Sequence, residues 1–315
     1  IPWAILLDPT SACNLHCTGC WAAEYGNKLN LSFDEIDNII QQGKELGIYM
    51  YIYTGGEPLV RLSLPDFIAA LHEIDGLEQI HLTTNGSLFA PMAQTLKDAG
   101  LQGVNFSLDT LDPDIFSRIT RTGRLEDVLA GIDQALALGY APVKINCVPI
   151  RGINSGGITE IAALAKNAPL EVRFIEMMPI GCGKDFHPVP MDEVLQTLEQ
   201  SFGKAIPFTG KLGSGPAAYV TFPGFRGHVG FISAVTHEFC AQCNRIRLTA
   251  EGYLKLCLHY HTGVDLRTPL RASCGDEALT DTIRRAIAHK PDHHRFLQDA
   301  GSEPTEEHTM NAIGG

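Results

Sequence analysis

The chain has 315 residues, of which 44% are hydrophobic. This is enough to bury a large core in one large domain, with or without a smaller second domain. Its 24 basic and 36 acidic side chains give a formal net charge of -12. Nucleic-acid binders use a basic surface, so we expect no nucleic-acid partner, although a few placed Arg and Lys residues can bind a small anion. No apolar run approaches the ~18 residues of a membrane helix. We therefore expect no membrane association. Two tight groups of cysteines favour metal ligation over disulfides, which fits a reducing cytoplasm.

The first two thirds of the chain alternate β-rich runs with amphipathic stretches. We expect strands at residues 3–7, 49–53, 79–82, 103–108, 143–148 and 170–177. We expect helices at residues 32–46, 65–74, 91–99, 124–138 and 157–166. Strands that alternate with helices of this length predict βα units and a parallel sheet. About six units fit, fewer than the eight of a closed barrel, so the predicted fold is α/β, an incomplete (open) parallel β/α barrel.

The rhythm changes after residue 180, where Gly, Pro and Phe become more frequent. Short strands are expected at residues 217–222, 229–234 and 245–256, and a helix at residues 278–289. We therefore predict two domains. Residues 1–180 form the partial barrel, and residues 181–315 form a small C-terminal α+β extension that closes its open side.

Nine cysteines are an odd number, and six of them lie in two tight groups. This favours metal ligation over disulfides. The first group, Cys13, Cys17 and Cys20, directly follows the first predicted strand. Three thiolates in one loop can hold three irons of a 4Fe-4S cluster and leave the fourth iron open for a ligand. A zinc site with His16 as the fourth ligand is the alternative.

A turn of sequence Gly55-Gly56-Glu57-Pro58 follows the second predicted strand. Paired glycines let the backbone approach a ligand closely, and Glu57 provides an anion that can face an ammonium group. An ordinary βα turn is the plainer interpretation. Since the turn comes one βα unit after a three-cysteine loop, the chain resembles the radical S-adenosylmethionine (SAM) superfamily. The resemblance implies that SAM chelates the open iron, that the turn contacts its amine, and that the reduced cluster releases a 5′-deoxyadenosyl radical.

The second cysteine group is Cys240, Cys243 and Cys257. Three cysteines again suggest a cluster with one open iron, and a zinc knuckle completed by His259 or His261 is the alternative. This group predicts a second metal site in the C-terminal extension.

Two arginines lie beside this second group. In an extended strand, Cys243, Arg245 and Arg247 share one face, and the intervening residues point into the core. Guanidiniums about 7 Å apart suit neighbouring phosphates of a triphosphate. A solvated, charged strand face is the alternative.

Over about residues 54–315 the chain resembles the GTP 3′,8-cyclase family of molybdenum cofactor (molybdopterin) biosynthesis. The resemblance rests on Thr-Gly-Gly-Glu-Pro-Leu-Val-Arg (residues 54–61), Leu-Thr-Thr-Asn-Gly (82–86), Arg-Phe-Ile-Glu-Met-Met (173–178), the second cysteine block and the Gly-Gly end. It implies a lyase that converts GTP to (8S)-3′,8-cyclo-7,8-dihydroguanosine 5′-triphosphate. It also implies two 4Fe-4S clusters, SAM and an external electron donor; a homodimer is compatible with the sequence.

The same resemblance implies roles for individual residues. The SAM-contacting positions are Gly55, Gly56, Glu57, Ser107 and Met178. The GTP-contacting positions are Thr83, Lys144, Arg245 and Arg247. The ligands of the first cluster are Cys13, Cys17 and Cys20, and those of the second are Cys240, Cys243 and Cys257. The catalytic positions are Arg245 and Arg247, with Gly314 and Gly315 on a tail expected to reach into the active site.

The N-terminal part departs from the cyclase pattern. Leu6 and Ile52 stand where family members carry arginines that face GTP, and residues 10–25 resemble peptide-modifying radical SAM branches instead. Each lost charged hydrogen bond is worth about 1.5–3 kcal/mol, so weakened GTP binding is expected. Two other hypotheses stay open: a radical SAM enzyme acting on a peptide or another small molecule, and a zinc-stabilised binding protein.

Overall fold

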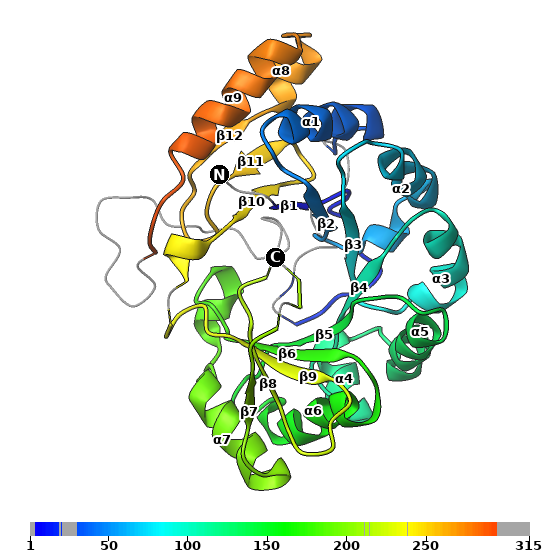
Figure 1. The fold of residues 1–315 in the computed structure, drawn as a ribbon, viewed down its shortest axis with the longest axis vertical. Coiled ribbons are helices and arrows are strands. Elements are labelled where there is room, and N and C mark those ends of the chain that lie inside the picture. The colour runs from blue at the N-terminus through cyan, green and yellow to red at the C-terminus, as the bar shows by residue number, and fades with distance from the viewer. Residues whose placement is uncertain are drawn as a thin grey trace. The chain divides into compact units, whose positions relative to one another are not determined.

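The computed structural model describes residues 4–18, 20, 30–210, 212–213, 215–237 and 239–294 (Figure 1). The helices are α1 (Phe33–Glu45), α2 (Leu64–His72), α3 (Phe89–Asp98), α4 (Pro113–Thr120), α5 (Leu125–Ala137), α6 (Ile158–Asn167), α7 (Met191–Phe202), α8 (Arg267–Arg271) and α9 (Asp276–Ala288). The strands are β1 (Ala4–Leu7), β2 (Met50–Tyr53), β3 (Gln79–Thr84), β4 (Gly103–Ser107), β5 (Val143–Cys147), β6 (Glu171–Ile175), β7 (Ile206–Phe208), β8 (Ala218–Thr221), β9 (His228–Ile232), β10 (Arg245–Leu248), β11 (Tyr253–Lys255) and β12 (Gly263–Asp265).

The chain divides into two compact units. Unit 1 comprises Ile1–Thr83, Gln94–Gln102 and Cys240–Gly315, and unit 2 comprises Thr84–Ala93 and Gly103–Phe239. Unit 1 therefore combines the beginning and the end of the sequence, and unit 2 is formed mainly by its middle part.

The sheet of unit 1 has the strand order β12-β11-β10-β1-β2-β3. Strands β10, β1, β2 and β3 are parallel, and β11 and β12 are antiparallel additions. Ile5 is in register with Ile246 on one side and Tyr51 on the other, and all three are 0–1% exposed. The Tyr51 hydroxyl donates to the Ile40 carbonyl of α1 at 3.2 Å, so this face of the sheet packs against the helices.

The sheet of unit 2 has the order β4-β5-β6-β9-β8-β7. Strands β4, β5, β6 and β9 are parallel, and β8 and β7 are antiparallel. Helix α5 packs on β4 and β5, and α6 packs on β6 and β9. The Phe89 ring lies edge-on to Phe106 at 5.1 Å and to Tyr140 at 5.5 Å, which centres the aromatic part of this core.

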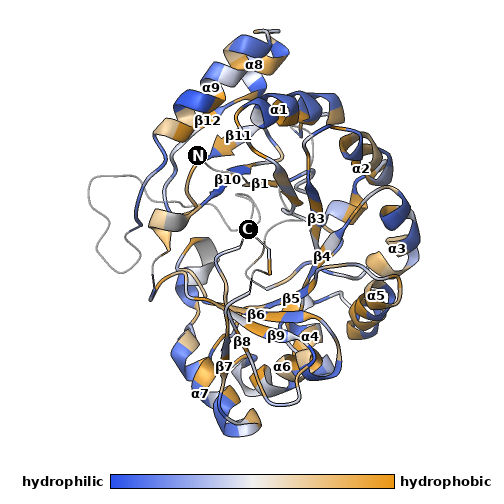
Figure 2. Ribbon diagram, in the orientation of Figure 1, coloured by the Kyte–Doolittle hydropathy of each residue, from blue (hydrophilic) through white to orange (hydrophobic). Residues whose placement is uncertain are grey.

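Colouring by hydropathy shows how both cores are built (Figure 2). The helices carry both hydrophilic and hydrophobic residues, as expected for elements that bury one face only. In α1 the buried positions are Ile36, Ile39, Ile40 and Gly43, at the spacing of one helical face. Ser32 and Glu35 begin this helix with a capping box.

The predicted fold class is confirmed. The strand order has two ends, β12 and β7, so the mainly parallel sheet is not closed. The six early strands lie where the sequence predicts them. The single strand expected at residues 245–256 is wrong, because a turn closed by the Gly252 amide on the Thr249 carbonyl divides it into the hairpin β10–β11. The sequence also did not predict α4, α7, α8, β7 and β12.

The C-terminal third of the chain supplies strands that pair with strands from its first two thirds in both units. Strand β10 pairs in parallel with β1, and β9 pairs in parallel with β6. The domain boundary at residue 180 stays a prediction. None of the described helices has the length and apolarity required to cross a bilayer.

Candidate active site

Each sheet has a site face, which we define as the face opposite its covering helices. In unit 1 the site face carries Leu6, Asp8, Ile52, His81, Arg245 and Arg247. In unit 2 it carries Asn105, Lys144, Asn146, Glu171 and Arg173. The alternation of strand side chains thus places three of the predicted GTP contacts, Lys144, Arg245 and Arg247, on these two faces.

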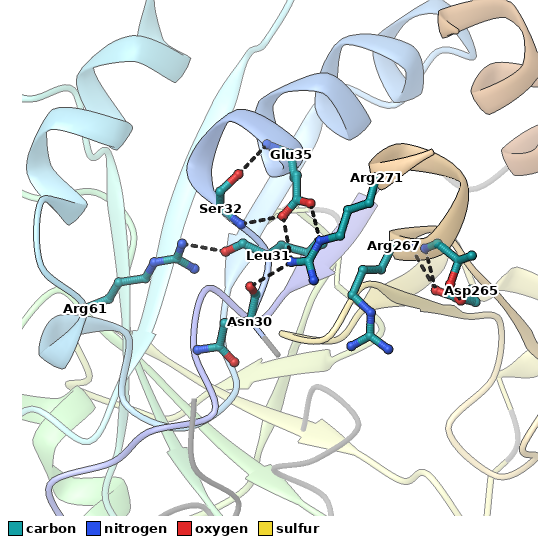
Figure 3. A network of polar contacts seen from close by, with 9 residues as sticks. Asn30, Leu31, Ser32, Glu35, Arg61, Asp265, Arg267 and Arg271 are labelled. Carbon is teal, nitrogen blue, oxygen red and sulfur yellow. Dashed lines mark hydrogen bonds and ion pairs between the residues drawn. The ribbon is translucent and has the colours of Figure 1, made fainter. Parts of the chain in front are cut away.

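Arg61 fixes both ends of the segment that contains the first cysteine group. Its guanidinium donates to the Pro9 carbonyl before the cysteines and, at 2.7 Å, to the Leu31 carbonyl after them. The same group lies 4.0 Å from the centre of the Phe33 ring. From the other side, Arg271 donates to the Asn30 carbonyl at 3.4 Å (Figure 3). The ends of the cysteine segment are therefore anchored to residues from α8 and from the turn before α2.

The cysteine loop and the glycine turn are in direct contact. The Glu57 amide donates to the Ala12 carbonyl at 2.8 Å. A Cβ on Gly56 would lie 2.1 Å from that same carbonyl oxygen, so only glycine allows this approach. The Glu57 side chain is fully buried and accepts from the Leu59 amide at 3.1 Å. The turn thus lies directly beside Cys13, and one Glu57 oxygen already has a structural partner.

The cysteines of the first group, Cys13, Cys17 and Cys20, are half-buried thiols. The Cys20 amide donates to the Cys17 carbonyl at 3.0 Å, and the Leu15 amide donates to the Cys13 sulfur at 3.4 Å. Among the described residues no three thiols come close enough together to form a metal site. Shared ligation of one cluster by these cysteines therefore stays a prediction.

Asp8 is a functional candidate that the sequence did not reveal. It follows β1, is 3% exposed, and its Oδ1 is buried with no hydrogen-bond donor from any described residue. A Cβ on Gly55, whose φ is +77°, would lie 2.3 Å from the Asp8 carboxyl carbon. Burial raises the pKa of Asp8 well above its usual value, and the charge of Arg247 opposes this. A carboxyl group thus lies directly on the glycine turn.

Strands β10 and β11 form a hairpin that places two cysteines of the second group at the same end. Cys243 precedes β10 and Cys257 follows β11, so both lie at the same end of the antiparallel pair. The Cys243 amide donates to the Cys240 carbonyl at 3.0 Å. All three are half-buried thiols. Within the described ranges, no three His, Cys, Asp or Glu side chains converge on one ion position.

Positive charge surrounds this second group. Burial alone would raise the pKa of the Cys243 thiol, but Lys290, the Arg245 amide and the charges of Arg247 and Arg245 together lower it. Lys290 is positioned by a 2.7 Å hydrogen bond to the Leu256 carbonyl. A lowered pKa favours the thiolate, the form that binds metal.

The strand alternation expected around Arg245 is observed. Ile246 and Leu248 are 0% and 1% exposed, whereas Arg245 and Arg247 lie half-buried on the site face. Arg247 is in register with Leu6, and Leu6 with Ile52. The two positions that lack the family's arginines are therefore next to Arg247 in one row across three parallel strands.

The site face of unit 2 is a polar network. Arg173 donates to Asn146 Oδ1 at 2.8 Å and to Asn105 Oδ1 at 2.9 Å. Lys144 is 5% exposed, and its Nζ donates to the Leu212 carbonyl at 2.5 Å. Burial raises the pKa of Glu171, and Lys144 and Arg173 act against this rise. The sequence analysis assigns no role to Arg173, although the alternation of polar and apolar residues along β6 (Glu-Val-Arg-Phe-Ile) is the signal for a side chain on this face.

The remaining predicted residues are placed as follows. Ser107 is exposed at the end of β4, Met178 is half-buried beyond β6, and Thr83 is half-buried on β3. Gly314 and Gly315 lie outside the described residues. Because unit 1 holds both cysteine groups, the glycine turn and the arginine pair, it contains most of the predicted chemistry.

The donor set fits iron–sulfur ligation and SAM binding. Each cysteine group offers three thiols from one short region, the ligand type of iron–sulfur clusters. The buried, unpartnered Asp8 oxygen beside the glycine turn offers an acceptor for a cationic ligand.

Comparisons with known proteins agree with this site. Residues 7–165 match the radical SAM superfamily, and residues 170–296 match the family Molybdenum Cofactor Synthesis C. A GTP 3′,8-cyclase of Desulforamulus reducens is 42% identical over 320 residues, covering 98% of this chain and 96% of the relative. One of Heliobacterium modesticaldum is 41% identical over 315 residues, covering 97% and 95%. The similarity includes the N-terminal segment that the sequence analysis set apart.

Among solved structures, the chain is similar to Streptococcus suis SuiB bound to S-adenosylmethionine. The TM-score is 0.66 at 14% identity, covering 90% of this chain and 68% of that one, which supports the fold. The fold, the three-cysteine loop and the glycine turn define a radical SAM enzyme, whose cofactors are SAM and an iron–sulfur cluster. Within that class, the chain belongs to the GTP 3′,8-cyclase family.

Proposed function

We propose that the chain converts GTP to (8S)-3′,8-cyclo-7,8-dihydroguanosine 5′-triphosphate, the first step of molybdenum cofactor biosynthesis. The names of its relatives support GTP over a peptide substrate. The observation that carries the proposal is the pair Arg245 and Arg247 on the site face beside Cys243 and Cys257. A triphosphate needs such adjacent guanidiniums, and a peptide substrate has no general need for them.

Two iron–sulfur clusters are part of the proposal. Cys13, Cys17 and Cys20 would hold the first, and Cys240, Cys243 and Cys257 the second. When bound, the first cluster and SAM supply a 5′-deoxyadenosyl radical that removes a hydrogen atom from the substrate. The lowered pKa of Cys243 supports thiolate ligation in the second group.

The chain's own residues would bind and orient the two small molecules. Gly55, Gly56 and Glu57 would hold the amino-acid part of SAM, with glycine required for close backbone approach. Ser107 and Met178 of unit 2 are further proposed SAM contacts. Their positions at the C-terminal ends of β4 and β6 fit the edge where parallel α/β sheets bind ligands.

Arg245 and Arg247 would bind phosphates of GTP and hold its ribose in place during the reaction. Lys144 and Thr83 are proposed as further GTP contacts. The Lys144 ammonium lies on the site face of unit 2, where it donates to the Leu212 carbonyl at 2.5 Å. Gly314 and Gly315 are proposed to act on a C-terminal tail in the active site.

The cellular setting is proposed from chemistry. Six thiol ligands need a reducing compartment, which supports the cytoplasm. An external electron donor must reduce the first cluster. We also propose no nucleic-acid or membrane partner, and a homodimer remains an assembly to test.

The test is anaerobic turnover of the iron-reconstituted chain with GTP, SAM and a reductant. The expected result is 5′-deoxyadenosine and a cyclised nucleotide in equal amounts. About eight irons per chain are expected for two clusters. A value of about four would exclude the second cluster. Deoxyadenosine without any cyclised nucleotide would contradict the proposed substrate.

A further inference from the structure

Asp8 is the one buried carboxylate of unit 1's site face, as far as that face is described, and the roles proposed above leave it unused. Its Oδ1 has no donor within the described part of the chain. A carboxylate buried without a partner is costly, so such groups are normally hydrogen-bonded, paired or ligand-binding. Among the described residues, the charge of Arg247 acts on Asp8, but none donates a hydrogen bond to its Oδ1, so this oxygen can accept one from a ligand.

The position of Asp8 indicates which ligand could supply this donor. Its carboxyl carbon occupies the space that a Gly55 side chain would need, so it touches the turn that the SAM amino-acid part would contact. The same turn is joined to the cysteine loop through the Ala12 carbonyl and the Glu57 amide. Asp8 therefore lies where the cysteine loop and the glycine turn meet.

The alternative anion, Glu57, is less well placed. It is fully buried, and its Oε1 accepts from the Leu59 amide, which begins the short 3-10 turn Pro58–Val60. No amide of the described residues donates to Oδ1 of the Asp8 side chain. Of the two carboxylates at the turn, Asp8 is the one with an oxygen available to a ligand.

We propose that Asp8 binds the methionine ammonium group of SAM. An ammonium carries three hydrogen-bond donors and a positive charge, which together satisfy a buried carboxylate oxygen. The sulfonium of SAM has no N–H or O–H donor and cannot do so. The inference rests on SAM being the cofactor, and it does not require GTP to be the substrate.

The experiment measures binding to the iron-reconstituted chain without turnover. Asp8→Asn keeps the shape and removes the charge. The Kd values for SAM and for S-adenosylhomocysteine, which keeps the ammonium and lacks the sulfonium charge, should both rise by about tenfold to a hundredfold. A SAM analogue lacking the amino group should bind wild type and variant equally.

Asp109→Asn is the matched control. Asp109 is a half-buried carboxyl, whose pKa is raised by burial to about 6, but it accepts from the Val148 amide in unit 2 and has no role in the site. It should leave all three Kd values within twofold. If Asp8→Asn fails to load iron, Asp8→Ser carries the same comparison of ligands.

Three outcomes would overturn the inference. Unchanged SAM binding by Asp8→Asn would mean that the carboxylate does not reach the cofactor. A loss for SAM but not for S-adenosylhomocysteine would assign Asp8 to the sulfonium. An equal loss for the amine-free analogue would make the effect structural. Normal SAM binding together with missing cyclised nucleotide would instead contradict only the proposed substrate.

Discussion

The two site faces differ in the surroundings of their positively charged side chains. In unit 2, Arg173 is held by two asparagine side chains, and Lys144 is held by a loop carbonyl. In unit 1, Arg247 lies in a row with the apolar Leu6 and Ile52 and interacts electrostatically with Cys243, Cys257 and Asp8. Arg173 and Lys144 of unit 2 are thus parts of a hydrogen-bond network, whereas Arg247 of unit 1 lies beside groups that would bind cofactors.

This difference suggests a division of roles. A side chain held by several hydrogen bonds, as Arg173 is, is preorganised and stabilises the fold. A guanidinium beside thiols and an apolar row contributes less to the fold and more to ligand binding. Mutations of similar chemistry in the two units should therefore have different consequences.

The largest effect is expected for a cysteine of unit 1. Cys17→Ala removes one of three thiols from a loop whose cluster carries the radical chemistry, so 5′-deoxyadenosine formation should fall by about 10³-fold or more. Cys147→Ala in unit 2 is the control, because this thiol is buried and burial raises its pKa. Chromatographic product analysis and iron content measure both. Retained activity in Cys17→Ala would contradict the assignment of the first cluster.

The next effect separates the arginines of the two units. Arg247→Gln should raise the Kd for GTP by about tenfold to a hundredfold, since a charged hydrogen bond is worth about 1.5–3 kcal/mol. Arg173→Gln breaks the hydrogen bonds to Asn146 and Asn105, so it should lower the free energy of unfolding by about 1–3 kcal/mol. Calorimetric binding and denaturant unfolding decide the matter. If Arg247→Gln mainly destabilises the fold, the division of roles is wrong.

The sequence predicted unit 1's chemistry better than its geometry. The cysteine groups and the glycine turn are local patterns, readable from spacing alone. Asp8 was not recognised as a site residue because its neighbours, Gly55 and Arg247, come from distant parts of the chain. The β10–β11 hairpin was missed because its apolar residues continue on both sides of a short turn. Pairing of β10 with β1 depends on tertiary contacts that no local pattern reports.

Unit 2 shows the same limit. The alternating burial of β6 follows its sequence, but the role of Arg173 as the centre of a network depends on asparagines of β4 and β5. Local sequence propensity was enough to predict where the strands lie. The contacts of Arg173 with Asn105 and Asn146 depend on the register between strands, which the sequence alone does not give.

A smaller effect is expected when unit 1 is made more like the family pattern. Leu6→Arg adds a guanidinium beside Arg247, and it should tighten GTP binding by about threefold to tenfold. The gain stays below that of a full charged contact because like charges opposite one another repel. Leu6→Met is the control for size without charge. An unchanged Kd for GTP would show that no phosphate lies near this row.

The smallest effect compares one surface ion pair in each unit. Arg271 pairs with Glu35 at 2.7 Å in unit 1, and Arg151 pairs with Glu193 at 2.7 Å in unit 2. Arg271 also donates to the Asn30 carbonyl at the end of the cysteine segment, whereas Arg151 bonds to Glu193 in an exposed setting. Arg271→Ala should therefore lower Tm by up to about 2 °C, and Arg151→Ala by less.

The pH dependence gives the sign of this last effect. The hydrogen bond from Arg271 is the largest cause that lowers the pKa of Glu35 below 4.5. A carboxyl whose pKa is lower in the folded state stabilises the fold above its unfolded pKa, and this contribution disappears as the pH falls through the folded value. The Tm difference between wild type and Arg271→Ala should thus be full at pH 7, shrink below about pH 4.5 and decrease with added salt. A difference that stays constant into acid would mean that Arg271 acts through the Asn30 carbonyl, and that the anchoring of the cysteine segment matters more than the ion pair.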